Sequence, residues 1–142
     1  MKTTTIAIIS LLATHYVHSN VFIEALIDVE SKGNPKAIGD GGKAFGALQI
    51  HKICIDDVNR VYGTSFVHED AFDVEKAKEI CRLYLSHYGK HYERTEKKTL
   101  TYEVLARIWN GGPKGYKKEA TTSYWFKVVD AMNRHRKQVA KK

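Results

Sequence analysis

The segment 21–50 constrains the fold of this chain more than any other part of its sequence. Apolar side chains recur at helical spacing in its first part, and the carboxyl side chain of Glu30 follows them directly. Gly33 and Pro35 then interrupt the helical pattern, and the loop 37–43 is rich in glycine. The sequence therefore predicts a helix that ends beside a glycine-rich loop or small hairpin and carries one acid at that end.

Glu30 is the first candidate for a functional residue because its helical neighbours are apolar. Burial beside apolar groups disfavours the carboxylate form and raises the pKa of an acid. A carboxylic acid that keeps its proton near neutral pH can act as a general acid. Further along the chain, the aromatic residue Phe45 and the amide residue Gln49 lie among apolar residues. An ordinary surface glutamate before a helix stop is the alternative interpretation.

The chain has 142 residues, which is enough for one domain with a hydrophobic core but not for two. Its formal net charge of +7 suits nucleic acid, anionic lipid or bacterial wall polymers, and charge alone does not choose among them. Part of the charge lies in the basic tail 134–142, which we expect to be frayed and solvated rather than a docking site. The main domain is placed at 20–133.

Residues 1–19 form a separate segment with the pattern of an export signal. Lys2 is followed by threonines and then by the apolar run 6–13, which has the length of a secretory hydrophobic region and is too short to span a bilayer. Positions 14–19 lack a clean pair of small residues for cleavage. We predict an exported protein, periplasmic or extracellular, and the alternative is an N-terminal helix packed on the domain.

The cysteines and histidines do not form a metal-binding pattern. Cys54 and Cys81 are neither a redox pair nor part of a zinc motif, so they form one disulfide in an exported protein or remain two buried thiols. His87 and His91 are one helical turn apart, but without a third ligand a solvated helix face is the better interpretation. No metal and no cofactor are predicted.

The rest of the chain has helical periodicity, without sustained alternation and without internal repeats. The first helix is expected to start at Asn20. The pattern predicts helices over 20–31, 52–62, 73–88 and about 100–110, and a last helix that begins near 122. The third should end at Gly89 and be followed by a charged linker over 91–98. The predicted fold is mainly α, with glycine-rich loops that border a cleft.

Two sequence motifs, one after the other along the chain, resemble those of the lysozyme-like lytic transglycosylases of the soluble-lytic-transglycosylase type, many of which are encoded by phages. The first family motif reads roughly E-S-x-x-N-P-x-A, then a short loop and G-A-x-G-x-x-Q-I. It is matched by Glu30, Ser31, Asn34, Pro35, Ala37, Ala44, Gly46, Gln49 and Ile50. The loop is one residue longer here, and Asp40 stands near the usual serine of the family.

A second family motif, often A-Y-N-A-G-P-G, is similar to residues 108–113, with Trp109 at the place of the tyrosine. Tyr84 and Leu85 match a Y-L pair on a helix between the motifs, and Tyr124 matches a tyrosine of the last helix. The likeness spans about residues 20–132 in the right order. It implies an α+β lysozyme-like fold with a sugar-binding cleft.

The resemblance also implies a reaction. Such enzymes cleave the β-1,4 bond between N-acetylmuramic acid and N-acetylglucosamine in peptidoglycan, and they leave 1,6-anhydro ends. Glu30 would be the only acid and base, because the muramyl 6-hydroxyl replaces water as the nucleophile. Ser31 would bond to Glu30 and orient it, and Tyr124 would bond near it. Core packing of Tyr124 is an equal alternative.

The remaining site residues follow from the same resemblance. Gln49 would line the sugar cleft, and Asn110 would present its amide to the N-acetyl or ring substituents. Phe45 and Trp109 are the candidate aromatic rings for the apolar faces of sugars. In most α domains these two rings would belong to the core, and Asn110 could simply cap its helix.

Asp40 leaves a second mechanism open. A second carboxylate across the cleft could activate water and make the protein an inverting lysozyme, which needs about 6.5–9.5 Å between the carboxyl groups. Alternatively, the Asp40 carboxylate bonds its own backbone in a turn with Gly41, and Asp40→Asn is then tolerated. Asp28 is a poor partner, because two residues along a helix place it away from Glu30.

Two other functions compete with peptidoglycan cleavage. A catalytically silent glycan-binding or virion structural module could keep the same fold. A helical nucleic-acid-binding domain could use the basic residues 134–137, but no recognised binding motif supports it, and the export pattern opposes it. We therefore expect peptidoglycan strands as the partner, no nucleic acid, no stable membrane span and a monomer.

Overall fold

The computed structural model describes residues 20–142 of the chain, and the predicted export signal over 1–19 lies outside the described residues. The helices are α2 (Asn20–Ser31), α3 (Lys52–Tyr62), α4 (Val74–Glu96), α5 (Tyr102–Gly111) and α6 (Thr122–Ala140). The strands are β1 (Ile38–Gly39), β2 (Ala44–Phe45) and β3 (Ile50–His51). Short 3₁₀ turns are η1 (Asp40–Gly42), η2 (His68–Phe72), η3 (Gly115–Lys117) and η4 (Glu119–Thr121). The mainly α prediction is confirmed.

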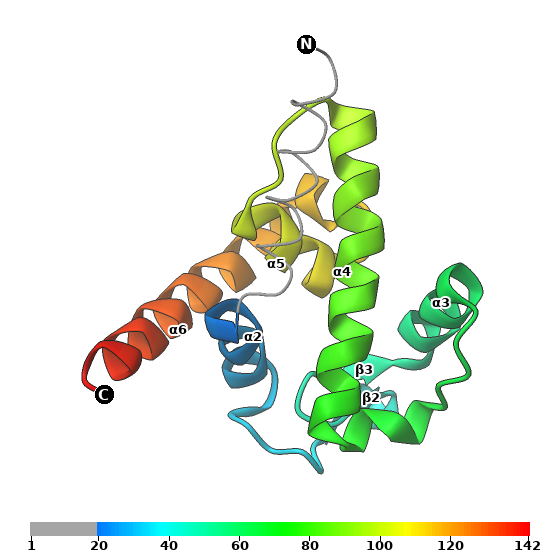
Figure 1. Ribbon diagram of the computed structural model, residues 1–142, viewed down its shortest axis with the longest axis horizontal. Coiled ribbons are helices and arrows are strands. Elements are labelled where there is room, and N and C mark those ends of the chain that lie inside the picture. The colour runs from blue at the N-terminus through cyan, green and yellow to red at the C-terminus, as the bar shows by residue number, and fades with distance from the viewer. Residues whose placement is uncertain (1–19) are drawn as a thin grey trace.

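The helices surround one hydrophobic core. α2 packs on α6, α5 packs on α4 and α6, and α3 packs on the other side of α4, which runs through the middle of the molecule (Figure 1). The largest fully buried side chains of these helices are Phe22, Ile23, Leu26, Ile55, Val58, Ile80, Leu85, Leu105 and Ile108. Within residues 20–142, no helix is both long and apolar enough to cross a membrane.

The glycine-rich loop forms a small antiparallel sheet in the order β1-β2-β3. Ile38 pairs with Phe45, which in turn pairs with Ile50, and η1 forms the turn between β1 and β2. β3 leads directly into α3. The sheet therefore lies between the end of α2, which carries Glu30, and the start of α3.

The predicted end of the third helix at Gly89 is wrong, because α4 continues to Glu96. A Cβ atom at Gly89 would lie 2.9 Å from the Leu100 side chain, so this glycine permits close packing rather than ending the helix. Tyr92 extends the buried stripe of α4 into the segment that was predicted to be a charged linker. α4 ends about one turn after Tyr92, where Lys97 adopts φ +55°.

The basic tail is helical rather than frayed, because α6 runs to Ala140. His135 Nε2 lies 3.1 Å from Asp28 Oδ2, and a guanidinium nitrogen of Arg134 lies 3.6 Å from the same oxygen. These contacts tie the tail to α2 through Asp28. The last residues of the tail are nevertheless exposed, as expected.

Gly46 is expected to be the most sensitive glycine of the sheet region. It adopts φ +77°, and a Cβ atom there would lie 1.8 Å from the backbone oxygen of Ala71. We predict that Gly46→Ala lowers the free energy of unfolding by about 3 kcal/mol or more, because the backbone of η2 must move. Gly63→Ala is the matched control, since Gly63 has φ +66° and open space around it, and should cost only about 1 kcal/mol. Equal losses in chemical denaturation would contradict this prediction.

Candidate active site

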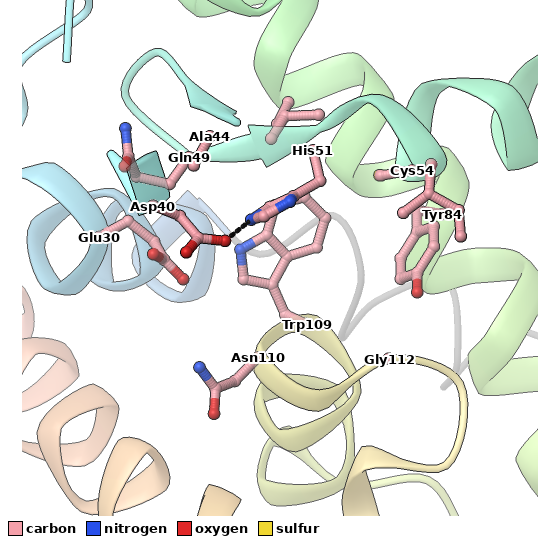
Figure 2. A pocket seen from close by; sticks show the side chains of 12 residues that line it. Glu30, Asp40, Ala44, Gln49, His51, Cys54, Tyr84, Trp109, Asn110 and Gly112 are labelled. Carbon is pink, nitrogen blue, oxygen red and sulfur yellow. Dashed lines mark ion pairs between the residues drawn. The ribbon is translucent and has the colours of Figure 1, made fainter. Parts of the chain in front are cut away.

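A cavity of about 440 Å³ opens where the end of α2, the small sheet, the start of α3 and the end of α5 meet (Figure 2). α4 contributes Tyr84 to the wall. The lining residues are Glu30, Asp40, Ala44, Gln49, Ile50, His51, Ile53, Cys54, Tyr84, Trp109, Asn110 and Gly112. Segments far apart in the sequence thus meet around Glu30.

Glu30 is partly buried at the C-terminal end of α2. Burial raises its pKa from the ordinary value of 4.5 to about 7, and the hydrogen bond from Tyr124 offsets part of this rise. The raised pKa predicted from the sequence is therefore confirmed. Near neutral pH, roughly equal amounts of the acid and the carboxylate are present, so one side chain can both donate and accept a proton. Its catalytic role remains a prediction.

Tyr124 contacts Glu30 from the core side of the cavity. Its hydroxyl donates to Glu30 Oε1 at 2.8 Å, and the ring is buried in the first turn of α6. Burial and the nearby carboxyl hold the pKa of Tyr124 well above its usual value, so the hydroxyl keeps its proton. The bond predicted from the resemblance is present. The ring belongs to the core and does not line the cavity, and only its hydroxyl reaches the acid.

Tyr124→Phe is predicted to move the alkaline limb of the pH–activity profile to higher pH. The tyrosine bond lowers the pKa of Glu30. Without it the carboxylate loses a donor, and the acid form should persist for about one more pH unit. The exposed Tyr62 supplies the control variant Tyr62→Phe. An unchanged limb, or a shift to lower pH, would contradict the assigned contact.

Trp109 and Asn110 occupy the last turn of α5, and both line the cavity. The Trp109 ring is half-buried and stands edge-on to Tyr84, with 5.7 Å between the centroids and 84° between the planes. Asn110 is exposed (Figure 2). Both are therefore available to a ligand, as the resemblance implies, although their binding roles remain predictions.

Gln49 lines the cavity, but its amide nitrogen holds the sheet together. Nε2 donates to the backbone oxygens of Gly46 at 3.0 Å and Ala37 at 3.3 Å, and the residue adopts φ +51°. A Cβ atom at Gly39 would lie 2.2 Å from Gln49 Oε1, so a side chain there would displace the Gln49 amide. The structure thus gives Gln49 a positioning role that the resemblance did not imply.

Besides Tyr124, two more predicted site residues do not line the cavity. Ser31 Oγ donates to the Ala47 oxygen at 2.8 Å and thereby ties the end of α2 to the chain before β3, so the bond from Ser31 to Glu30 was predicted wrongly. Phe45 stacks on His68 with 3.8 Å between the ring centroids. Successive side chains of a strand point to opposite faces, and since Ala44 lines the cavity, Phe45 faces η2.

Asp40 does line the cavity, but its carboxylate does not bond its own turn. Asp40 Oδ2 lies 3.2 Å from His51 Nε2, which connects η1 to β3. The turn interpretation is therefore right for the backbone, where Gly41 adopts φ +62°, and wrong for the side chain. The carboxylate belongs to the same cavity as Glu30.

Several lining residues were not predicted as part of the site. His51 is the sheet partner of Ala44, so a correct register would have placed it on the cavity face. Tyr84 was matched to the Y-L pair of the family but was not predicted to belong to the site. Cys54 and Cys81 are free and buried, which agrees with the interpretation as two thiols. Within the described part of the chain, no three side chains of His, Cys, Asp or Glu are grouped to hold a metal ion.

A small sheet beside a helical domain, with a partly protonated glutamate facing a cavity between them, defines a lysozyme-like protein. A family model described as "Transglycosylase SLT domain" matches residues 8–128. The chain belongs to this family, which confirms the resemblance, and it is a family of peptidoglycan-cleaving transglycosylases. A search of curated proteins found no match to the chain.

Proposed function

We propose that the chain is a lytic transglycosylase that cleaves the β-1,4 bond between N-acetylmuramic acid and N-acetylglucosamine with Glu30 as the only acid and base. The observation that carries this proposal is the position of Glu30. Its carboxyl group faces a cavity of about 440 Å³, and burial raises its pKa to about 7. Membership of the transglycosylase family supports peptidoglycan as the substrate.

The proposed reaction has two proton transfers. Protonated Glu30 first gives its proton to the glycosidic oxygen, so the bond breaks and positive charge develops at the muramyl C1. The resulting carboxylate then takes the proton of the muramyl 6-hydroxyl, whose oxygen bonds to C1 and closes the 1,6-anhydro ring. No water is consumed, and the acid ends in its starting state. A pKa near neutrality suits both steps.

Tyr124 and the end of α5 support this chemistry. The Tyr124 hydroxyl fixes one carboxyl oxygen of Glu30 and leaves the other to the cavity. Trp109 offers a ring to the apolar face of a sugar, and Asn110 offers an amide to the N-acetyl group. The protonated form of Glu30 can therefore give its proton to a leaving oxygen bound in the cavity.

An inverting lysozyme is the second candidate, because Asp40 lines the same cavity. In that mechanism Asp40 would activate a water molecule opposite Glu30. The His51 imidazole occupies one oxygen of Asp40, which leaves the other to the cavity. We propose the lyase because it needs no second carboxylate.

Mass spectrometry of digested peptidoglycan tests the proposal. We expect muropeptides that are lighter by one water than the hydrolysis products and carry anhydro-muramyl ends. Reducing ends would identify a hydrolase, and loss of all cleavage in Asp40→Asn would assign Asp40 to the chemistry. Failure to cleave, combined with tight binding of glycan strands, would identify a silent binding module.

We also propose that the protein acts outside the cytoplasm as a monomer. Its substrate class lies in the cell wall, and the sequence pattern over 1–19 supports export. A phage-encoded protein directed at a host wall would meet the same polymer. Cell fractionation after expression with and without the first 19 positions tests the location.

A further inference from the structure

The cavity wall carries little positive charge, although the chain as a whole is basic. Of the residues from 20 to 142 that line the cavity, none is a lysine or an arginine, whereas the formal net charge of the chain is +7. Burial raises the pKa of Cys54 to about 12, and it holds the pKa of Tyr84 well above its usual value, so both are uncharged at neutral pH. The other ionisable groups in the wall are Glu30, Asp40 and His51.

Asp40 presents its carboxylate to this cavity from a fixed position. Its backbone adopts φ +48°, and His51 Nε2 lies 3.2 Å from Oδ2, so the side chain is held between η1 and β3 (Figure 2). The Asp40 side chain is 66% exposed, and any ligand in the cavity meets its charge. Glu30 is different, because its proton neutralises it during the first chemical step.

We propose that Asp40 makes the cleft selective for glycan strands whose lactyl carboxyl groups are capped. The inference rests on the proposed function, because lactyl groups occur on muramic acid. A lactyl carboxyl is an amide where a peptide is attached, and it is a carboxylate where the peptide has been removed. A strand of carboxylates beside Asp40 meets a like charge, and among residues 20–142 the cavity wall offers no lysine or arginine in compensation. A lactyl group in its amide form carries no charge of its own and avoids this repulsion.

Two matched tetrasaccharides of alternating N-acetylglucosamine and N-acetylmuramic acid test the proposal. One has free lactyl carboxylates, and the other has the same groups as N-methylamides. At low salt we expect kcat/KM to be about tenfold higher for the amide, which is the order of effect of one like charge within a Debye length. Raising the salt concentration should reduce this ratio.

Three variants identify the residue responsible. Asp40→Asn, which suits the left-handed backbone, should bring the ratio close to one. His51→Ala should leave the ratio above one, because the Asp40 charge remains, and the double variant should behave like Asp40→Asn. Asp56→Asn is the control, since Asp56 is an exposed aspartate on α3 that does not line the cavity, and it should leave the ratio unchanged.

Binding separates this inference from the proposed function. Calorimetry with Glu30→Gln, and with Glu30→Gln combined with Asp40→Asn, measures the same charge preference without cleavage. Tighter binding of the amide to the first variant, but not to the second, supports the inference even if the wild type cleaves neither saccharide. Equal ratios with and without Asp40 overturn it, and so does loss of cleavage of both saccharides in Asp40→Asn.

Discussion

Replacing Glu30 with glutamine is expected to reduce glycan cleavage by about 10²- to 10⁴-fold, the range that a positioned general acid contributes. Glutamine keeps the size of the side chain and can accept the Tyr124 hydrogen bond, but it has no proton to give to the glycosidic oxygen. The fold and the binding of saccharides should therefore remain. Clearing of turbid wall suspensions, followed by product analysis, measures the loss.

Glu79→Gln is the matched control for this experiment. Glu79 is an exposed residue of α4 that does not line the cavity, so the same chemical change there should leave cleavage within about twofold of wild type. Cleavage by Glu30→Gln at a comparable rate would remove Glu30 from the chemistry. The transglycosylase proposal would then lose its acid.

Glu30→Gln is also expected to stabilise the protein, and the gain should depend on pH. The folded pKa of about 7 lies above the ordinary value of 4.5, so between these values the folded state binds more protons than the unfolded state. The contribution of protonated Glu30 to the free energy of unfolding is thus fully present below pH 4.5, and it is lost as the pH rises to 7. The difference between the two pKa values corresponds to about 3 kcal/mol.

The variant lacks this titration, so its free energy of unfolding should exceed that of the wild type by up to about 3 kcal/mol at pH 8. Near pH 4.5 the two proteins should differ by much less. Urea denaturation at both pH values measures the difference, and Glu79→Gln again serves as the control. A gain that is independent of pH, or no gain at pH 8, would show that Glu30 ionises without cost in the folded protein.

Local signals in the sequence were sufficient for most helix boundaries. The bounds of α2 and α3 were predicted as they are observed, because Gly33 and Pro35 stop the first helix and Gly63 ends the second in a left-handed conformation. Thr101 caps α5, because its side-chain oxygen accepts a hydrogen bond from the Val104 amide. These features depend on neighbouring residues and can be read from spacing alone.

The errors concern contacts between distant segments. A glycine such as Gly89 is typical of a helix end. Here it lies inside α4, because the side chains of Leu100 and Leu105 pack where a side chain of residue 89 would be. The face of Phe45 depends on the register of a sheet with strands of two residues, too short to show an alternating pattern. The place of His51 in the cavity wall was missed for the same reason.

The site itself was only partly predictable. The acid and its raised pKa follow from an apolar helix end, which is a local property. Tyr124, which bonds Glu30 across 94 positions of the chain, was suggested by family resemblance and not by periodicity. Ser31 was expected to orient Glu30 and Gln49 to line the sugar cleft, whereas their hydrogen bonds hold the backbone around the cavity.

An NMR titration of the Glu30 side-chain carboxyl carbon tests most directly whether one buried acid is poised for both proton transfers. The signal is assigned by its absence from Glu30→Gln. We predict a midpoint near pH 7, well separated from those of the exposed glutamates. A midpoint near 4.5 would mean that Glu30 is a solvated carboxylate at neutral pH, and that a single general acid at this position does not explain cleavage.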